Sequence, residues 1–459
     1  MIRTQANAKV DSEVHKASLI KTVFNRLAQF TPTQLLVVAA SFHVTLALTF
    51  FLIGRFHLLP GLFDANGIGI PFAIDGTTYL YFTKELADGL RTGGPSSWFS
   101  LAAPFHCRLY SLTFVFPGCL LGYNTLSAEP LNLIYYLGTL SFLYLLAKEL
   151  FNRRAGLLAA IIVGLWPSFL LHSTQLIRDS LFCCLMLAFV YLLTILLRRP
   201  LSLRWTVVAV ILGFVLIVVL WLIRGNWWNL IFAQLVITLV LLSIRMFRER
   251  IFPVGNLVVL IVIFVAALMV PNRIKVMTVG GSAPPTAVFA IPSSSRPASS
   301  NSMWSRFVTQ IRARRGGFRV YTLRQSDIGS DVVFKDAGDI VKFLPRAAVI
   351  GFFAPFPKMW VESGTGGRMG RLLSGLETFV MYLLYFPAGF CLWKGRRNLA
   401  LWLMFLSIFI GLVALGLVVV NAGALYRFRY ILWIFTIAMA ADGLVRIWDQ
   451  RSKGVKASD

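Results

Sequence analysis

The chain has 459 residues, of which 57% are hydrophobic, and its mean hydropathy is +0.74. Soluble domains are about 45–50% apolar, so this composition excludes a soluble globular protein and predicts a polytopic membrane protein. The net charge of +25 does not indicate nucleic-acid binding, because most basic residues lie in short loops between apolar segments.

The N-terminal segment and the cysteines bear on membrane anchoring and on disulfide or zinc sites. Residues 1–30 are polar and lack the apolar region of a cleavable signal, so we expect the first span to be a retained anchor. The five cysteines form neither a disulfide framework nor a zinc-ligand spacing. The sequence therefore predicts no cofactor and no metal.

Ten segments are long and apolar enough to cross a bilayer, which takes about 20 residues of helix. They are 34–54, 130–148, 156–174, 180–197, 205–223, 227–244, 252–270, 373–393, 399–420 and 427–447. A weaker segment, 105–121, is short and opens with His106 and Arg108. The expected fold is therefore all-α, with about ten transmembrane helices.

Basic loops set the expected sidedness of these spans. The clearest are 148–154, 198–204, 245–250, 394–397 and the tail from 446. Cytoplasmic loops are enriched in Lys and Arg, and counting back from the tail puts all five on one side. The basic N-terminal tail joins them only if 105–121 does not cross. We therefore expect both termini in the cytoplasm and 105–121 as a re-entrant or surface helix.

This topology divides the chain into five parts. We expect a cytoplasmic tail at 1–33, a transmembrane catalytic module at 34–270 with an external loop at 55–129, an external loop domain at 271–371, C-terminal transmembrane helices at 372–447 and a cytoplasmic tail at 448–459. Residues 279–303 are rich in Gly, Ser and Pro and indicate a flexible connector. Residues 304–371 are strongly basic and include Arg346. An anionic ligand such as a lipid phosphate would explain this charge, and a solvated loop is the alternative.

The first external loop carries a candidate catalytic carboxylate. From Tyr79 onward, apolar residues recur at Phe82, Leu86 and Leu90, which predicts a helix lying along the membrane surface. Asp75 precedes this helix at the outer face. It is either a catalytic group or a cap of the helix, and the two roles are compatible.

Other polar residues at span ends fall on the same face. Charged side chains near membrane depth are costly and are retained mainly for function. Their convergence predicts a single site at the outer leaflet. They are His172, Arg178, Asp179, Arg224, Asn226, Trp227, Trp228, Tyr426, Arg427 and Arg429.

Each of these residues has a structural alternative. Arg178 and Asp179 could form a structural ion pair, and Arg427 and Arg429 could be interface anchors. Trp227 and Trp228 are typical of an aromatic belt. His172 is more often a satisfied polar residue than a base. His43, inside the first span, is expected to hydrogen-bond to a neighbouring helix, and Glu377 either pairs with Arg371 or faces the site.

Several segments resemble the polytopic GT-C-type glycosyltransferases, which include dolichyl-phosphate-mannose-protein mannosyltransferases and aminoarabinose transferases. The resemblance begins with the acidic first loop, where Asp75 and Tyr79 form a D-x-x-x-Y pattern before an amphipathic helix. It continues in residues 130–160, where a basic turn joins two spans. It extends to WPSFLLHSTQLIRDSLF at 166–182, FLPRAAVIGFFAPFPKMW at 343–360 and YRFRYIL at 426–432. Residues 35–200 and 305–435 carry it.

The resemblance implies transfer of a sugar from a polyprenyl-phosphate donor to a lipid, glycan or protein acceptor. By this analogy Asp75 is the general base, and Arg427 and Arg429, then Arg178, bind the donor phosphate. The other substrate-binding candidates are Asp179, Tyr79, Lys84 and Arg346. The expected location is the cell inner (plasma) membrane, with the site on the periplasmic or extracellular face and with membrane lipids rather than nucleic acid as partners.

The chain departs from the family in one respect. Many members have two adjacent acidic residues in the first loop, whereas Gly76 follows Asp75 here. This argues against a metal site built on paired carboxylates, and it leaves Asp64 as a competing base.

Two other functional classes remain as alternatives. A polymerase or ligase of surface polysaccharide usually relies on one large late loop, so an acidic first loop favours the transferase. A lipid-linked glycan transporter or flippase would show inverted repeats and ionisable residues near span centres. The sequence shows no internal repeat.

Overall fold

The computed structural model describes residues 30–59, 75–116, 118–274, 303–320, 327–361 and 367–456. Within these ranges the regular structure is helical, apart from one isolated bridge between Asp327 and Asn421. The prediction of an all-α fold is confirmed.

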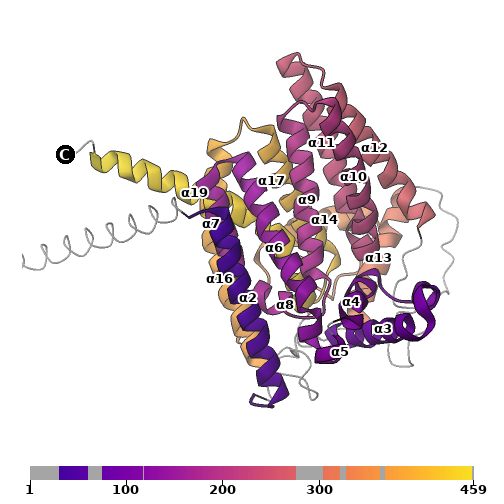
Figure 1. The fold of residues 1–459 in the computed structure, drawn as a ribbon. Helices are drawn as coiled ribbons and strands as arrows, with labels where there is room; N and C mark the ends of the chain where they lie inside the picture. Colours follow the sequence, from indigo (N-terminus) through magenta and orange to yellow (C-terminus); the bar gives the residue numbers. More distant parts are fainter. Residues whose placement is uncertain are drawn as a thin grey trace, which may run out of the picture.

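The helices follow one another along the chain in the order shown in Figure 1. They are α2 (Pro32–Arg55), α3 (Asp75–Ser100), α4 (Phe105–Val115), α5 (Gly118–Leu121), α6 (Thr125–Leu150), α7 (Arg153–Gly164), α8 (Pro167–Ser173), α9 (Asp179–Arg198), α10 (Leu203–Arg224), η2 (Gly225–Trp227), α11 (Trp228–Glu249), α12 (Val254–Arg273), α13 (Met303–Val320), α14 (Ala337–Phe353), α15 (Pro357–Trp360), α16 (Gly367–Lys394), α17 (Leu399–Val418), α18 (Ala422–Phe428) and α19 (Tyr430–Lys456).

Among the described residues, eight helices are long and apolar enough to cross a membrane, and the pair α7 and α8, bent by 67°, would be a ninth span. One of the eight is the 47-residue run 203–249, which contains α10, η2 and α11. Arg224, at the end of α10, contacts Asp179 at the start of α9, whereas Arg245 near the end of α11 donates to the Leu197 carbonyl near the end of α9. A helix of 20 residues is about 30 Å long, so α10 and α11 run in opposite directions. Counted as two spans, they bring the total to the ten predicted.

The weak segment 105–121 does not form a span. Helix α4 ends at Val115 and α5 has only four residues. Helices α3, α4 and α5 lie together at one end of the bundle (Figure 1). In α3 the predicted apolar face is buried at Tyr79 and Leu86, while Lys84 is exposed, so the amphipathic helix is confirmed. The helix is broken at Gly94, whose φ of 69° suits glycine.

The basic segments gather at the opposite end of the bundle from α3. Side-chain contacts connect them to one another. The contacts are Arg199 with Glu149, Arg154 with Asp449, Arg245 with Leu197, and Asn398 with Leu150. Arg153 also donates to the Phe30 carbonyl, so the start of α2 lies at this end. This arrangement agrees with the predicted placement of the basic segments on one side of the membrane.

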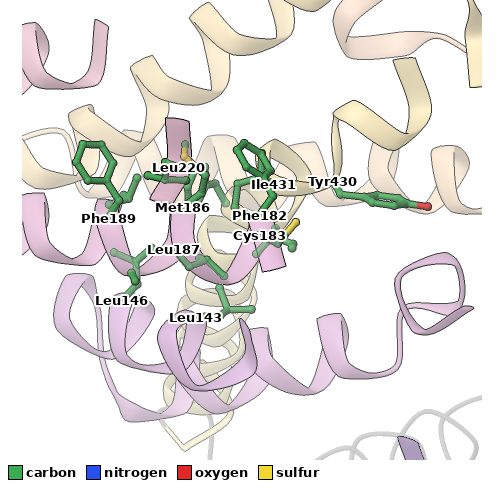
Figure 2. Close-up of a cluster of buried hydrophobic side chains, with 14 of the residues drawn as sticks. Leu143, Leu146, Phe182, Cys183, Met186, Leu187, Phe189, Leu220, Tyr430 and Ile431 are labelled. Carbon is green, nitrogen blue, oxygen red and sulfur yellow. The ribbon is translucent and has the colours of Figure 1, made fainter. Parts of the chain in front are cut away.

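The core lies where α6, α9 and α10 meet α19. Leu143 on α6, Met186 on α9, Leu220 on α10 and Ile431 on α19 are all buried there (Figure 2). Lipid is as apolar as these side chains, so their contribution comes mainly from close packing. Helix α19 is buried almost throughout its first 14 residues, which fixes the position of the segment immediately before it.

A buried polar contact ties α2 to this core. His43 Nδ1 lies 2.8 Å from a Glu129 oxygen on α6, and its Nε2 lies 2.9 Å from Ser173 Oγ on α8. The expected hydrogen bond from His43 to a neighbouring helix is therefore confirmed. Most of the rest of α2 is exposed in the structure, so this contact fixes its position.

Helix α14, from the second long loop, packs directly on the spanning helix α17. A Cβ atom added at Gly416 would lie 2.0 Å from the Ala347 carbonyl oxygen, and one added at Gly351 would lie 2.0 Å from the Leu412 carbonyl oxygen. Small residues allow helix backbones to approach this closely within a membrane. The second loop is therefore fastened to the bundle through two glycines.

We expect Gly416→Ala to destabilise the protein by about 1–3 kcal/mol, because overpacking forces α14 and α17 apart. Gly389→Ala is the matched control, since a Cβ atom at Gly389 would meet nothing within 4 Å. Thermal unfolding in detergent compares the two variants. Equal stability of the two would contradict the close packing.

Candidate active site

Four charged residues, distant in the chain, form a continuous series of ion pairs. Asp75 Oδ2 accepts from Arg427 Nη1 at 2.9 Å, Asp179 Oδ2 accepts from Arg427 Nη2 at 2.9 Å, and Asp179 Oδ1 accepts from Arg224 Nη2 at 2.5 Å. We call this series the ion-pair chain. It joins α3, α18, α9 and α10, and it lies at the end of the bundle opposite to the basic segments.

Helix ends explain why these charges meet. Asp75 and Asp179 are the first residues of α3 and α9, where the helix dipole favours a negative charge. Arg224 and Arg427 lie in the last turns of α10 and α18, where a positive charge is favoured. Each side chain therefore suits its own helix end as well as its partner.

Burial changes along the ion-pair chain. The exposed fractions of the side chains are 2% for Asp179, 4% for Arg224, 16% for Arg427 and 45% for Asp75. Arg224 also lies over the rings of Phe182 and Phe428, at 5.1 and 5.0 Å. The chain therefore has a closed end at Arg224 and an open end at Asp75.

Arg178 adds a further positive charge beside the ion-pair chain. It donates to the Ile223 carbonyl at 3.3 Å and forms no ion pair with the described residues. Together with the ion-pair chain it gives three arginines against two carboxylates. The site as a whole therefore carries excess positive charge and suits an anion.

Two neutral side chains lie beside Arg178. The rings of Tyr79 and His106 meet edge to face, with their centroids 4.3 Å apart. Burial raises the pKa of the Tyr79 hydroxyl. Burial first, and then the charge of Arg178, lower the pKa of His106 to about 3. Both groups are therefore uncharged at neutral pH.

The structure brings together five of the predicted site residues: Asp75, Tyr79, Arg178, Asp179 and Arg427. Two others lie elsewhere and face different groups. Lys84 is exposed and lies 5.7 Å from the centre of the Tyr123 ring, and Arg346 is half exposed and pairs with Asp331 at 3.7 Å. The competing base Asp64 lies outside the described residues.

Arg429, the other predicted phosphate ligand, contacts a different helix from Arg427. It is fully buried, donates to the Gly351 carbonyl on α14 at 3.1 Å and stacks on Trp433 at 4.5 Å. The Tyr385 hydroxyl donates to the next carbonyl of α14, that of Phe352. A cation at this position suits the negative end of the α14 dipole.

The sequence left the roles of Glu377 and His172 undecided, and in the structure both are hydrogen-bonded within the bundle. Glu377 accepts from Trp166 Nε1, from Ser168 and from the Tyr426 hydroxyl, so it connects α16 to α8 and α18. His172 Nδ1 lies 2.7 Å from the Ser168 carbonyl, which agrees with a satisfied polar residue.

Sequence analysis counted Arg224 among the polar residues that converge on the outer face but gave it no role in the site. It follows an apolar span and precedes two tryptophans, which is typical of an interface belt. The available signal was a basic residue at a span end away from the cytoplasmic loops, where basic residues are depleted.

Comparison with known proteins indicates which kind of enzyme this chain is similar to. Residues 111–269 match the model of a family described as dolichyl-phosphate-mannose-protein mannosyltransferase. The resemblance to GT-C-type membrane glycosyltransferases is confirmed. The matched part of the chain contains Asp179 and Arg224, whereas Asp75 and Arg427 lie outside it. No curated protein matches the chain.

Two solved structures are similar to this chain. One is the archaeal oligosaccharyltransferase AglB from Archaeoglobus fulgidus in complex with an inhibitory peptide and a dolichol-phosphate, with a TM-score of 0.47 and 13% identity. The other is an Archaeoglobus fulgidus oligosaccharyltransferase in the apo form, with a TM-score of 0.47 and 14% identity. Each comparison covers 94% of this chain and 52% of the solved chain, so this chain spans about half the length of those proteins.

We expect Asp179→Ala to destabilise the protein by about 3–5 kcal/mol, because it leaves the buried Arg224 without a partner. Adding Arg224→Met should restore part of this loss, since the second change removes the unpaired charge. Unfolding in detergent measures both variants. Equal stability of Asp179→Ala and the wild type would show that the buried pair is not a structural requirement.

The low pKa of His106 predicts an acid-sensitive stability. The folded protein keeps His106 neutral, whereas the unfolded chain binds a proton below about pH 6.5, so stability falls as the pH drops from 6.5 toward 3. Between pH 7 and 4 this group alone contributes a loss of about 3 kcal/mol. His106→Gln should show a correspondingly smaller loss of unfolding free energy over this range. An unchanged pH slope in the variant would refute the assignment.

Proposed function

We propose that this chain is a membrane glycosyltransferase that moves a sugar from a polyprenyl-phosphate donor to an acceptor hydroxyl. The proposal is supported chiefly by the ion-pair chain, which combines the half-exposed carboxylate of Asp75 with the guanidinium of Arg427 and lies beside Arg178. The match of residues 111–269 to a mannosyltransferase family supports the same class of reaction.

The donor phosphate binds at Arg178 and Arg427 in this proposal. A guanidinium stays charged and can donate two parallel hydrogen bonds to phosphate oxygens. Arg178 has no carboxylate partner among the described residues, and Arg427 is held in place by Asp179. We propose that Arg429 acts differently, as a positioning residue that fixes α14 against the segment carrying Arg427.

Asp75 is the catalytic base in the proposed reaction. The acceptor oxygen attacks the anomeric carbon, and the hydroxyl proton passes to the Asp75 carboxylate. The bond between the anomeric carbon and the phosphate oxygen breaks, and its electron pair leaves with the polyprenyl phosphate. The sugar is transferred with inversion. Tyr79, Arg224 and Asp179 are positioning residues, since they contact or neighbour the groups that hold substrate.

We place the reaction on the external face of the cell inner (plasma) membrane. The support is the opposite position of the basic segments, which are typical of cytoplasmic loops. The acceptor is a lipid, a glycan or a protein. Lys84 and Arg346 lie away from the ion-pair chain, and we propose no contact between them and the donor phosphate. That no cofactor or metal takes part stays a prediction.

We expect Asp75→Asn to lower sugar transfer by about 10²–10⁴-fold, the usual contribution of a positioned general base. Transfer is measured in vesicles with a polyprenyl-phosphate sugar, after expression levels are matched. Glu85→Gln is the control, because Glu85 is an exposed acid on the same helix. Activity near wild type in Asp75→Asn would remove the base role and direct attention to Asp64.

We expect Arg178→Gln to raise the apparent KM for the donor by about 10–100-fold, with a smaller effect on kcat, because it removes a charged hydrogen-bond donor. Arg346→Gln removes the same charge from an exposed position on α14 and should leave KM unchanged. An unaltered KM in Arg178→Gln would dismiss its phosphate contact.

A further inference from the structure

Arg427 holds two carboxylates of very different surroundings. Its Nη2 binds Asp179, which is 2% exposed and also binds Arg224. Its Nη1 binds Asp75, which is 45% exposed. The two distances are equal, at 2.9 Å, so the difference between the contacts lies in solvent and not in geometry.

This difference makes one contact permanent and the other exchangeable. A buried pair cannot open without leaving a charge unsolvated, so Asp179 keeps the guanidinium in place. An exposed pair is screened by water and is easily replaced by another anion. The Nη1 side of Arg427 is therefore the position at which an incoming anion can compete.

The contact between Asp75 and Arg427 conflicts with both proposed roles. Asp75 Oδ2 accepts a hydrogen bond from Arg427, so the carboxylate is held against the guanidinium and only Oδ1 is left for the acceptor hydroxyl. Arg427 Nη1 is occupied by a carboxylate, although it must receive the donor phosphate.

Resting on the proposed function, we propose that the donor phosphate displaces Asp75 from Arg427 and thereby releases the base. Before donor binding, Asp75 occupies Nη1 and is held away from the acceptor. When a phosphate oxygen takes Nη1, Arg427 remains neutralised and the Asp75 carboxylate becomes available to the acceptor hydroxyl. Donor binding and activation of the base are then one exchange at one nitrogen atom.

The exchange predicts that loss of the base tightens donor binding. A polyprenyl monophosphate without sugar is the probe, and its equilibrium binding is measured on the full chain in lipid nanodiscs. Asp75→Asn should bind the probe about fivefold more tightly than the wild type, the weight of one exposed ion pair. Glu85→Gln, which removes an exposed acid from the same helix, should bind like the wild type.

A double-variant cycle separates competition from simple charge repulsion. If Asp75 competes for Arg427, the gain from Asp75→Asn disappears when Arg427 is replaced by Gln. A gain that persists in the Arg427→Gln background overturns the exchange. Arg427→Lys, which keeps the charge, is measured in parallel, so that a loss of folding in the Gln variant does not remove the test. In the Lys background the gain should be retained at least in part.

The transfer assay keeps this inference distinct from the proposed function. If Asp75→Asn loses transfer but binds the probe no more tightly, the base role stands and the exchange is wrong. If Asp75→Asn binds the probe more tightly and still transfers sugar, the exchange stands and the base role is wrong.

Discussion

The buried carboxylate of Asp179 is the contact on which the site depends. It lies between Arg224 and Arg427 and satisfies both, so two cations can be held at the end of a membrane bundle. Without it, the buried Arg224 would be an unpaired desolvated charge, which is among the most costly states in a protein interior, and Arg427 would keep only the exposed Asp75. Its position as the first residue of α9 makes it rigid, because α9 is buried along most of its length. The location of Arg427, and through it that of Asp75, follows from this one residue.

Two further features support the same geometry. Glu377 accepts a hydrogen bond from Tyr426, which precedes Arg427, and so fixes α18 against α16. Helix α19 begins directly after α18 and is anchored in the core. Because α18 has only seven residues, its direction is set by these neighbours and not by its own hydrogen bonds. The segment that carries Arg427 is therefore held at the C-terminal end of α18.

The sequence predicted the fold better than the site. Hydropathy located all ten spans, since each apolar segment is about as long as a bilayer is thick. It also identified 105–121 as too short, and loop charge grouped the basic segments. The sequence of a span end shows a charged residue but not the residue that it pairs with. Arg224 was therefore placed on the outer face without a role. The family resemblance gave Arg427 and Arg429 one role, as ligands of the donor phosphate, whereas in the structure they contact different helices. Which neighbour a residue meets is decided by tertiary packing, and periodicity alone does not contain it.

The junction between α18 and α19 contacts helices from both long loops, α3 and α14. Arg427 donates a hydrogen bond to Asp75 at the start of α3. Two residues later, Arg429 donates a hydrogen bond to the Gly351 carbonyl of α14. Gly351 also presses against the backbone of α17, so α14 has little freedom to slide independently of that span. Helices α3 and α14 are therefore both attached to the same three-residue stretch, 427–429.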